Sequence, residues 1–267
     1  MPFASGKRVL DAACGEGYGS ALLATGAAHV TGLDISPDAV GHAKKRYGHQ
    51  SNLAFDVGDC TKLDSKLGPF DLIVSFETLE HVTEQGDLVA GFARALTPDG
   101  ILVISSPDKK TYSDERGYSN EFHVRELYRD ELFDLLRPHF PFVRLYGQKL
   151  LFQSAIWNME SSAGYVHAVT SAGDVPQTGL NYAPLYFIAV CSRHALPDSM
   201  PGVALFGDRE ESVYEHYNTE VRRNMTAGHR IAELERELNT LRTATSSNPT
   251  IDQAPSPWWR RVLRNKR

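Results

Sequence analysis

A glycine-rich turn close to the start of this 267-residue chain decides which folds it can adopt. A short apolar run ends at Asp11, the glycines Gly15, Gly17 and Gly19 follow, and a helix-forming segment comes directly after them. Such a turn lets the backbone approach a ligand closely, and the N-terminus of the helix offers free N–H groups to an anion. A second apolar run ends at Asp34, where an acid is placed to accept hydrogen bonds from a ribose. The segment therefore predicts a β–α–β unit that holds a ligand at its glycine turn.

The spacing of the glycines separates two classes of ligand. The dinucleotide fingerprint G-x-G-x-x-G needs its third glycine where this chain has Ser20. Asp11 and Glu16 flank the turn, and two carboxylates would repel a pyrophosphate, whereas they attract the ammonium group of an amino-acid ligand. The segment resembles motif I of the class I S-adenosylmethionine (SAM) methyltransferases, which runs strand, D-x-x-C-G-x-G, helix.

Strand-like and helix-like segments alternate along the chain, which is typical of a mostly parallel sheet covered on both faces. The strand-like segments are residues 7–12, 30–34, 53–57, 70–75, 101–105, 142–148 and 185–191. The helical segments are residues 18–25, 37–47, 87–96 and 129–136, and Ser36 before Pro37 is a good start for the second. We therefore predict an α/β fold: a Rossmann-like class I methyltransferase sheet of about seven strands with a C-terminal helical extension.

Charge and composition limit the binding partners and the cellular compartments that we expect for this chain. The net charge of −5 gives no basic field, so we expect no nucleic-acid partner. The cysteines Cys14, Cys60 and Cys191 form no C-x-x-C pair and indicate a reducing compartment. We find no signal-peptide pattern and no apolar run of membrane-spanning length, so we predict a cytoplasmic protein.

The composition changes after His194, and we predict four regions. Residues 1–194 form the SAM-dependent methyltransferase domain, 195–209 a linker, 210–242 a charged helix, and 243–267 a flexible linker with a basic aromatic tail. The tail, residues 258–267, joins two tryptophans to five basic residues. Two interpretations of it stay open: a segment that binds a partner or an anionic membrane at its inner face, and a disordered basic end.

The charged helix carries a regular apolar seam. Ile231, Leu234, Leu238 and Leu241 follow 3-4-3 spacing, and the same register places Asn224 and Tyr217 in the seam. One interpretation is a short coiled coil with a polar register residue, which would bind a protein partner or make a homo-oligomer. The other is a helix that packs on its own domain.

The methyltransferase resemblance covers residues 7–193 and implies a set of SAM-binding residues: Asp11, Gly15, Gly17, Asp34, Ile35, Asp59, Cys60 and Phe76. In the family, the positions matching Asp11 and the glycine turn hold the methionine portion. Those matching Asp34 and Ile35 contact the ribose and the adenine. Those matching Asp59 and Cys60 bind the adenine edge, and the end of the fourth strand, at Phe76, borders the sulfonium.

The segment from Glu77 to His81 follows the fourth strand and carries the strongest chemical signal. In a helical turn, Glu77, Glu80 and His81 would share one face beside the methyl donor, and such ligands suit a divalent cation. With the later H-x-x-E-x-x-R segment that begins at His123, the pattern resembles metal-dependent O-methyltransferases of small RNAs and of the ubiquinone pathway. That resemblance implies Mg²⁺ or Mn²⁺ held by Glu77, Glu80, His81 and His123, with Glu77, His81 and His123 as catalytic residues.

Other interpretations stay open at this point. His81 could act as the general base of a metal-independent small-molecule methyltransferase, or the chain could be a non-catalytic SAM-binding scaffold. The whole pattern looks most like bacterial methyltransferases of surface-polysaccharide biosynthesis, which implies a saccharide or glycan acceptor. Four aromatic residues of the two long connections, residues 107–128 and 151–184, could stack on sugar rings: Tyr112, Tyr118, Phe122 and Trp157.

Overall fold

The computed structural model describes residues 3–63, 67–151, 169–172, 175–180, 182–196, 202–203 and 212–246. The chain divides into two compact units, Met1–Met200 and Pro201–Arg267. The predicted linker 195–209 lies largely outside the described residues, and Trp157 and the tail 258–267 lie wholly outside them.

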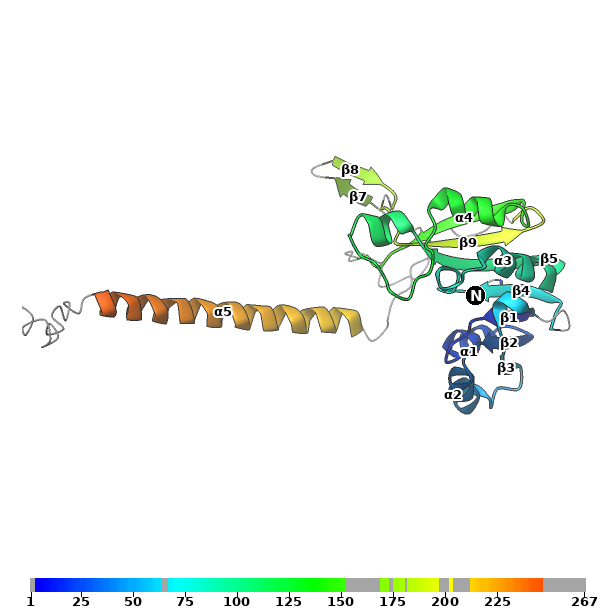
Figure 1. Ribbon diagram of the computed structural model, residues 1–267, viewed down its shortest axis with the longest axis horizontal. Coiled ribbons are helices and arrows are strands. Elements are labelled where there is room, and N and C mark those ends of the chain that lie inside the picture. Colours follow the sequence, from blue (N-terminus) through cyan, green and yellow to red (C-terminus); the bar gives the residue numbers. More distant parts are fainter. Residues whose placement is uncertain are drawn as a thin grey trace, which may run out of the picture. The chain divides into compact units, whose positions relative to one another are not determined.

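The first unit is built on a seven-stranded sheet, whose order is β3-β2-β1-β4-β5-β9-β6 (Figure 1). Its strands are β1 (Arg8–Ala12), β2 (His29–Asp34), β3 (Leu53–Val57), β4 (Phe70–Ser75), β5 (Leu96–Pro107), β6 (Phe142–Gln148) and β9 (Tyr186–Ser192). The five strands from β3 to β5 run parallel, and β9 pairs antiparallel with both β5 and β6. The prediction of a mostly parallel, Rossmann-like sheet of seven strands is confirmed.

Side chains that alternate along the strands divide the core between the two faces of the sheet. On one face, Val9, Leu72 and Val74 pack with residues of α1 (Tyr18–Ala24) and α2 (Pro37–Tyr47). On the other face, Leu10 and Ile73 pack with residues of α3 (Gln85–Ala95) and α4 (Arg129–Leu136). A strand reverses its side chains at each residue, so β1 and β4 supply both layers and are covered on both sides.

The helix starts follow the sequence closely. The Ser36 hydroxyl accepts a hydrogen bond from the N–H of Ala39, and Pro37 is the first residue of α2, so this predicted cap is confirmed. The N-terminus of α1 follows Gly17, whose φ of 81° is left-handed. Both helices begin directly after strands whose carboxyl ends line the same edge of the sheet.

One strand is longer than the sequence predicts. The sequence predicts a strand at residues 101–105, whereas β5 already begins at Leu96, which pairs with Phe70, while Ile101 pairs with Leu72. The residues between these two pairs form an irregularity in the register, which the sequence pattern does not distinguish from a loop. At its other end β5 continues to Pro107, where it pairs with Tyr186 of β9.

The two long connections contain structure of their own. The first includes η3 (Lys110–Asp114), a π-helical turn, and an isolated bridge between Asp108 and Leu127. The second includes a two-stranded hairpin, β7 (Val169–Ala172) and β8 (Val175–Thr178). Two 3₁₀ turns follow the carboxyl ends of β3 and β4: η1 (Cys60–Lys62) and η2 (Leu79–His81).

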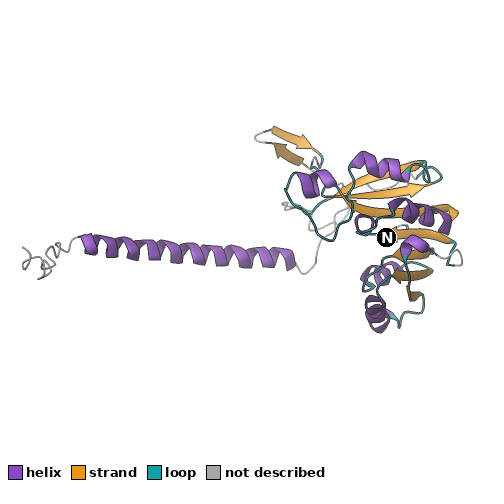
Figure 2. Ribbon diagram, viewed as in Figure 1, coloured by secondary structure: helices purple, strands orange, loops and turns teal. Residues whose placement is uncertain are grey.

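Among its described residues, the second unit contains one element, the helix α5 (Ser212–Ser246), drawn without interruption in Figure 2. It begins two residues later than predicted and continues four residues beyond the predicted end at residue 242. Among the helices that the structure describes, none has both the length and the apolar composition that crossing a bilayer would need.

Candidate functional site

The candidate site lies where the parallel strands end. The carboxyl ends of β1, β2, β3 and β4 meet at one edge of the sheet. Asp34 is the last residue of β2, and the glycine turn, Asp59 and the segment from Phe76 to His81 come soon after the other three ends. Ligands of open α/β sheets bind at this edge.

The glycine turn has the backbone geometry that only glycine adopts without strain. Gly15 has a φ of 52° and Gly17 a φ of 81°. A Cβ on Gly17 would lie 2.6 Å from the Phe55 ring and 2.8 Å from the Cβ of Ala43, so this glycine is required for packing. A Cβ on Gly15 would meet nothing within 4 Å, so the space beside this residue is open to a ligand.

Two acids hold the turn in place. The carboxylate of Asp34 accepts the N–H of Gly15 at 2.8 Å on one oxygen and the N–H of Ser36 at 2.9 Å on the other. A carboxylate has about four acceptor positions, so half of them remain for a ligand's hydroxyl groups. Asp11 is buried and accepts the Ser20 hydroxyl at 2.6 Å. Burial raises the pKa of Asp11 to about 6, against the opposing effect of the Ser20 hydrogen bond.

Asp59 and Cys60, which the resemblance places at the adenine edge, make contacts within the chain. The carboxylate of Asp59 accepts the N–H and the hydroxyl of Thr61, and these hydrogen bonds lower its pKa. Its second oxygen lies 3.3 Å from the Nζ of Lys62. Asp59 therefore caps η1, and Cys60, the first residue of that turn, is buried.

Two apolar side chains at the same edge are uncovered. Ile35 is 70% exposed and Phe76 is 41% exposed, directly after β2 and β4. An isolated exposed apolar residue is ordinary. Here both residues follow strands that end beside the glycine turn, so apolar surface is exposed at this edge of the sheet.

Glu77 adopts a strained backbone conformation. Its φ of 50° is left-handed, which is rare for a residue with a long side chain and is often found at functional sites. Ser105 stabilises it twice, because its hydroxyl accepts the N–H of Glu77 at 2.8 Å and donates to the Glu77 carboxylate at 2.7 Å. Burial raises the pKa of Glu77, and the Ser105 hydrogen bond opposes that effect.

Glu80 is a buried acid whose carboxylate has no hydrogen-bond partner among the described residues. Its side chain is 1% exposed, and neither carboxylate oxygen has a hydrogen bond from a described residue. Its backbone carbonyl accepts the N–H groups of Val124 and Arg125, which fixes the connection after β5 against η2. Burial raises the pKa of Glu80 to about 7, and the carboxylates of Glu77 and Glu126 add to the effect. A buried carboxylate without a partner is costly, so this position calls for a cation or a proton.

The two histidines present their Nε2 atoms as acceptors. Nδ1 of His81 donates to the carbonyl oxygen of Phe122 at 2.7 Å, and its Nε2 lies 3.8 Å from Oε1 of Glu80. Nδ1 of His123 donates to Glu126 at 2.6 Å, and Nε2 accepts the side-chain N–H of Asn120 at 2.9 Å. Hydrogen bonds at Nδ1 are the usual way in which proteins orient a metal-binding imidazole.

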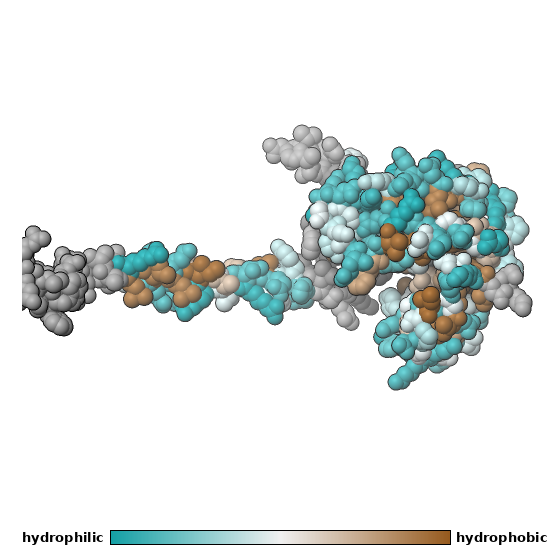
Figure 3. All heavy atoms as spheres, viewed as in Figure 1, coloured by the Kyte–Doolittle hydropathy of each residue, from teal (hydrophilic) through white to brown (hydrophobic). Residues whose placement is uncertain are grey.

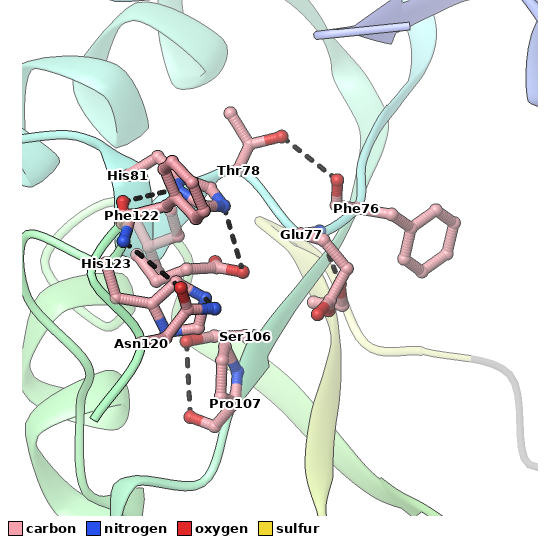
Figure 4. Close-up of polar contacts among 12 residues, drawn as sticks. Phe76, Glu77, Thr78, His81, Ser106, Pro107, Asn120, Phe122 and His123 are labelled. Carbon is pink, nitrogen blue, oxygen red and sulfur yellow. Dashed lines mark hydrogen bonds and ion pairs between the residues drawn. The ribbon is translucent and has the colours of Figure 1, made fainter. Parts of the chain in front are cut away.

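Glu80, His81 and His123 each offer one ligand atom within 4.8 Å of the others. The imidazole rings meet edge to face with their centroids 5.0 Å apart. Figure 4 shows the two histidines gathered with Asn120 and Phe122, while Glu77 lies apart and the ring of Phe76 points away from them. Two imidazoles and an unpaired carboxylate form a donor set that fits a divalent cation.

The structure therefore brings together three of the four predicted ligands. The prediction that Glu77 lies in one helical turn with Glu80 and His81 is wrong. The turn η2 spans only Leu79–His81, and Glu77 has a left-handed φ. The carboxylate of Glu77 consequently turns to Ser105.

Several contacts of the site were not predicted from the sequence, which assigned Glu126, Ser113 and Tyr186 no role and assigned Tyr112 only a role in stacking on a sugar ring. Glu126 orients His123 and also accepts the hydroxyl of Ser113. Tyr112 stacks on His123 with ring centroids 5.4 Å apart, and Tyr186 lies beside Tyr112 at 5.6 Å. The H-x-x-E spacing was the available signal for Glu126. Ser105 could have been found from its position near the end of the strand beside β4.

Known proteins resemble this chain over its first part. Residues 3–149, more than half of the chain, match the family described as "Methyltransferase domain". A relative from Mycolicibacterium smegmatis, described as a probable S-adenosylmethionine-dependent methyltransferase, is 37% identical over 133 residues, which are 49% of this chain and 51% of the relative. A relative of the same description from Mycobacterium tuberculosis is 36% identical over 136 residues, 51% of this chain and 48% of the relative.

Among solved structures, the N-methyltransferase NodS of Bradyrhizobium japonicum, in complex with S-adenosyl-L-homocysteine, matches with a TM-score of 0.47 and 19% identity. The match covers 70% of this chain and 78% of that one. The chain spans about half the length of the curated relatives described above.

Proposed function

This chain belongs to the SAM-dependent methyltransferases of class I, and we propose that it transfers a methyl group from SAM to a hydroxyl of a saccharide or glycan, with the help of a divalent cation. The observation that carries the proposal is the carboxylate of Glu80, which is buried beside the two histidines and has no hydrogen-bond partner among the described residues.

The donor side of the proposal rests on the edge of the sheet. The open space beside Gly15 would admit the methionine portion, with the buried acid of Asp11 behind the turn. The spare acceptor positions of Asp34 would bind the ribose hydroxyls. The uncovered side chains of Ile35 and Phe76 would pack against the adenine and the sulfonium region.

The cation side rests on the donor set. Glu80, His81 and His123 would hold the ion, and two imidazoles with a carboxylate suit Mn²⁺ better than Mg²⁺, which prefers oxygen ligands alone. When bound, such an ion lowers the pKa of a neighbouring substrate hydroxyl and orients it. Glu126 keeps the His123 ring oriented, and the carbonyl of Phe122 does the same for His81.

The acceptor class rests on aromatic surface next to this cluster. Tyr112 stacks on His123, and Tyr118 meets Tyr112 edge to face at 6.0 Å. Phe122 is 70% exposed on the same connection. Aromatic rings beside a hydroxyl-directing site suit the apolar face of a sugar ring, whose neighbouring hydroxyls could then reach the cation.

The test is methyl transfer from labelled SAM to a panel of glycans by protein treated exhaustively with EDTA. We expect no turnover until Mn²⁺ is added, and a weaker recovery with Mg²⁺. Glu80→Gln should abolish the recovery, whereas Glu121→Gln, which changes an exposed acid of the neighbouring connection, should leave it intact.

Two outcomes would favour other functions. Turnover that survives chelation would support a metal-independent enzyme in which His81, with Nε2 available as acceptor, is the general base. SAM binding without turnover on any acceptor would support a non-catalytic SAM-binding scaffold.

A further inference from the structure

The helix α5 carries an apolar stripe that the described residues do not cover. Ile231, Leu234, Leu238 and Leu241 are between 46% and 68% exposed. They recur at 3-4-3 spacing and therefore lie along one side of the helix. Figure 3 shows hydrophobic side chains gathered along part of α5.

We propose that α5 binds the α5 of a second copy of this chain as a parallel, in-register, two-stranded coiled coil. In heptad terms, Tyr217, Asn224, Ile231 and Leu238 occupy a positions, and Leu234 and Leu241 occupy d positions. A β-branched residue at a with leucine at d favours two strands, and an asparagine at one a position fixes the register of a parallel pair.

The charges beside the stripe favour this partner and this direction. Arg230 and Glu237 occupy the g positions, and Glu235 and Arg242 the e positions. In a parallel, in-register pair, each g residue faces the e residue five positions later on the other helix. Arg230 would face Glu235 of the second copy, and Glu237 would face Arg242, so both contacts join opposite charges.

The ion pairs within one helix do not prevent these contacts between two helices. Arg230 donates to Glu233 at 2.6 Å, but both side chains are more than half exposed, and an exposed i,i+3 pair contributes little. Toward the N-terminal end the stripe is interrupted by Asn224 at an a position and by Ala227 and Glu220 at d positions. The apolar contact is therefore short, and we expect a monomer–dimer equilibrium that depends on concentration.

The first experiment is sedimentation equilibrium of the full chain over a wide range of concentration. Glu235→Arg places two arginines opposite each other at both symmetric contacts and should weaken dimerisation about tenfold. The double variant Arg230→Glu/Glu235→Arg restores opposite charges, keeps the net charge, and should recover the wild-type dissociation constant. Arg236→Glu, at the outer f position, is the matched control and should have no effect.

The second experiment tests direction. Leu234→Cys should give a disulfide-linked dimer on mild oxidation, because d positions face their equivalents in a parallel pair. Wild-type protein, which has three cysteines outside α5, is the control and should stay uncrosslinked.

A chain that stays monomeric throughout would overturn the proposal, and so would a dimer that ignores Glu235→Arg or is not restored by the double variant. A charge-sensitive dimer that Leu234→Cys does not crosslink would overturn the parallel arrangement. If the chain is monomeric and the backbone amides of residues 231–241 exchange more slowly than those of an isolated helix, the helix instead packs on its own chain.

Discussion

The backbone N–H of Gly15 donates a 2.8 Å hydrogen bond to the carboxylate of Asp34, which connects the glycine turn after β1 to the end of β2. One acid therefore sets the position of the turn and keeps further acceptor positions, which in the proposed function bind the ribose hydroxyls. Removing the Asp34 side chain would affect both the position of the turn and the binding of the ligand. A smaller change at this residue should weaken both without removing either.

Asp34→Asn should weaken the binding of S-adenosyl-L-homocysteine about 10- to 100-fold. The amide replaces one acceptor oxygen with a donor, so either a backbone N–H or a ligand hydroxyl loses its partner, and a hydrogen bond to a charged group contributes about 1.5–3 kcal/mol. Titration calorimetry measures the change. Asp56→Asn, at an exposed position of β3, is the control; equal affinity of both variants would show that Asp34 does not bind the ligand.

Binding of the same ligand should strengthen as the pH rises through about 6 and level off above it. Burial raises the pKa of Asp11 to about 6, and the ligand's ammonium group favours the ionised form. One pH unit below that pKa the affinity should be about tenfold lower than at neutral pH.

Asp11→Asn should remove this pH dependence and lower the affinity at neutral pH. The same variant should also remove a pH dependence of the free energy of unfolding. The folded chain keeps a proton on Asp11 that the unfolded chain loses above its ordinary pKa, so Asp11 makes the free energy of unfolding fall between about pH 4 and pH 6. A pH profile of affinity that is unchanged in the variant would mean that another group titrates.

Glu80→Gln should stabilise the metal-free protein above pH 8 and abolish stabilisation by Mn²⁺. Burial raises the pKa of Glu80 to about 7, so its ionisation in the folded chain costs about 3 kcal/mol, and the free energy of unfolding falls as the pH rises from about 4.5 through 7. Thermal unfolding at two pH values, with EDTA or Mn²⁺, measures both effects. If Mn²⁺ raises the melting temperature of the variant as much as that of the wild type, the cation does not bind at Glu80.

Glu126→Gln should reduce Mn²⁺ affinity 10- to 100-fold while leaving the binding of S-adenosyl-L-homocysteine unchanged. The carboxylate of Glu126 accepts Nδ1–H of His123 and thereby directs Nε2 toward the cluster, and such outer partners typically change metal affinity by this factor. Electron paramagnetic resonance of free Mn²⁺ gives the dissociation constant. Glu121→Gln should match the wild type.

Asn120→Ala should have the opposite effect and tighten Mn²⁺ binding about fivefold. The side-chain N–H of Asn120 occupies the Nε2 lone pair of His123, and this hydrogen bond of about 1 kcal/mol must break before a cation can bind there. The same resonance titration is used. Weaker binding in Asn120→Ala would indicate that Asn120 holds the ring in place for the cation.

The sequence alone predicted the strands, the glycine turn and the acids that border the site. The glycine turn and the acids Asp11 and Asp34 follow the ends of apolar runs, and parallel strands bring such ends to one edge of the sheet. The cap at Ser36 depends only on neighbouring residues and was equally predictable. These features arise from local chemistry and from the handedness of β–α–β units.

The detailed arrangement was not predictable in the same way. The left-handed backbone of Glu77 depends on Ser105, which is 28 residues away in sequence, and it overrides the helical spacing that would have aligned Glu77 with Glu80. The orientation of His123 depends on how the connection after β5 folds back to Glu80. Contacts of this kind arise from tertiary packing and leave no periodic signal.

The order of the strands has a consequence for how the protein is made. Within the described sheet, β6 pairs only with β9, and β9 comes from the end of this unit, at residues 186–192. While the ribosome is still synthesising the preceding residues, β5 and β6 each present an unpaired edge to other nascent chains. Truncation at residue 149, where the recognisable family similarity ends, would make that exposure permanent, and the shortened product should aggregate rather than accumulate as folded protein.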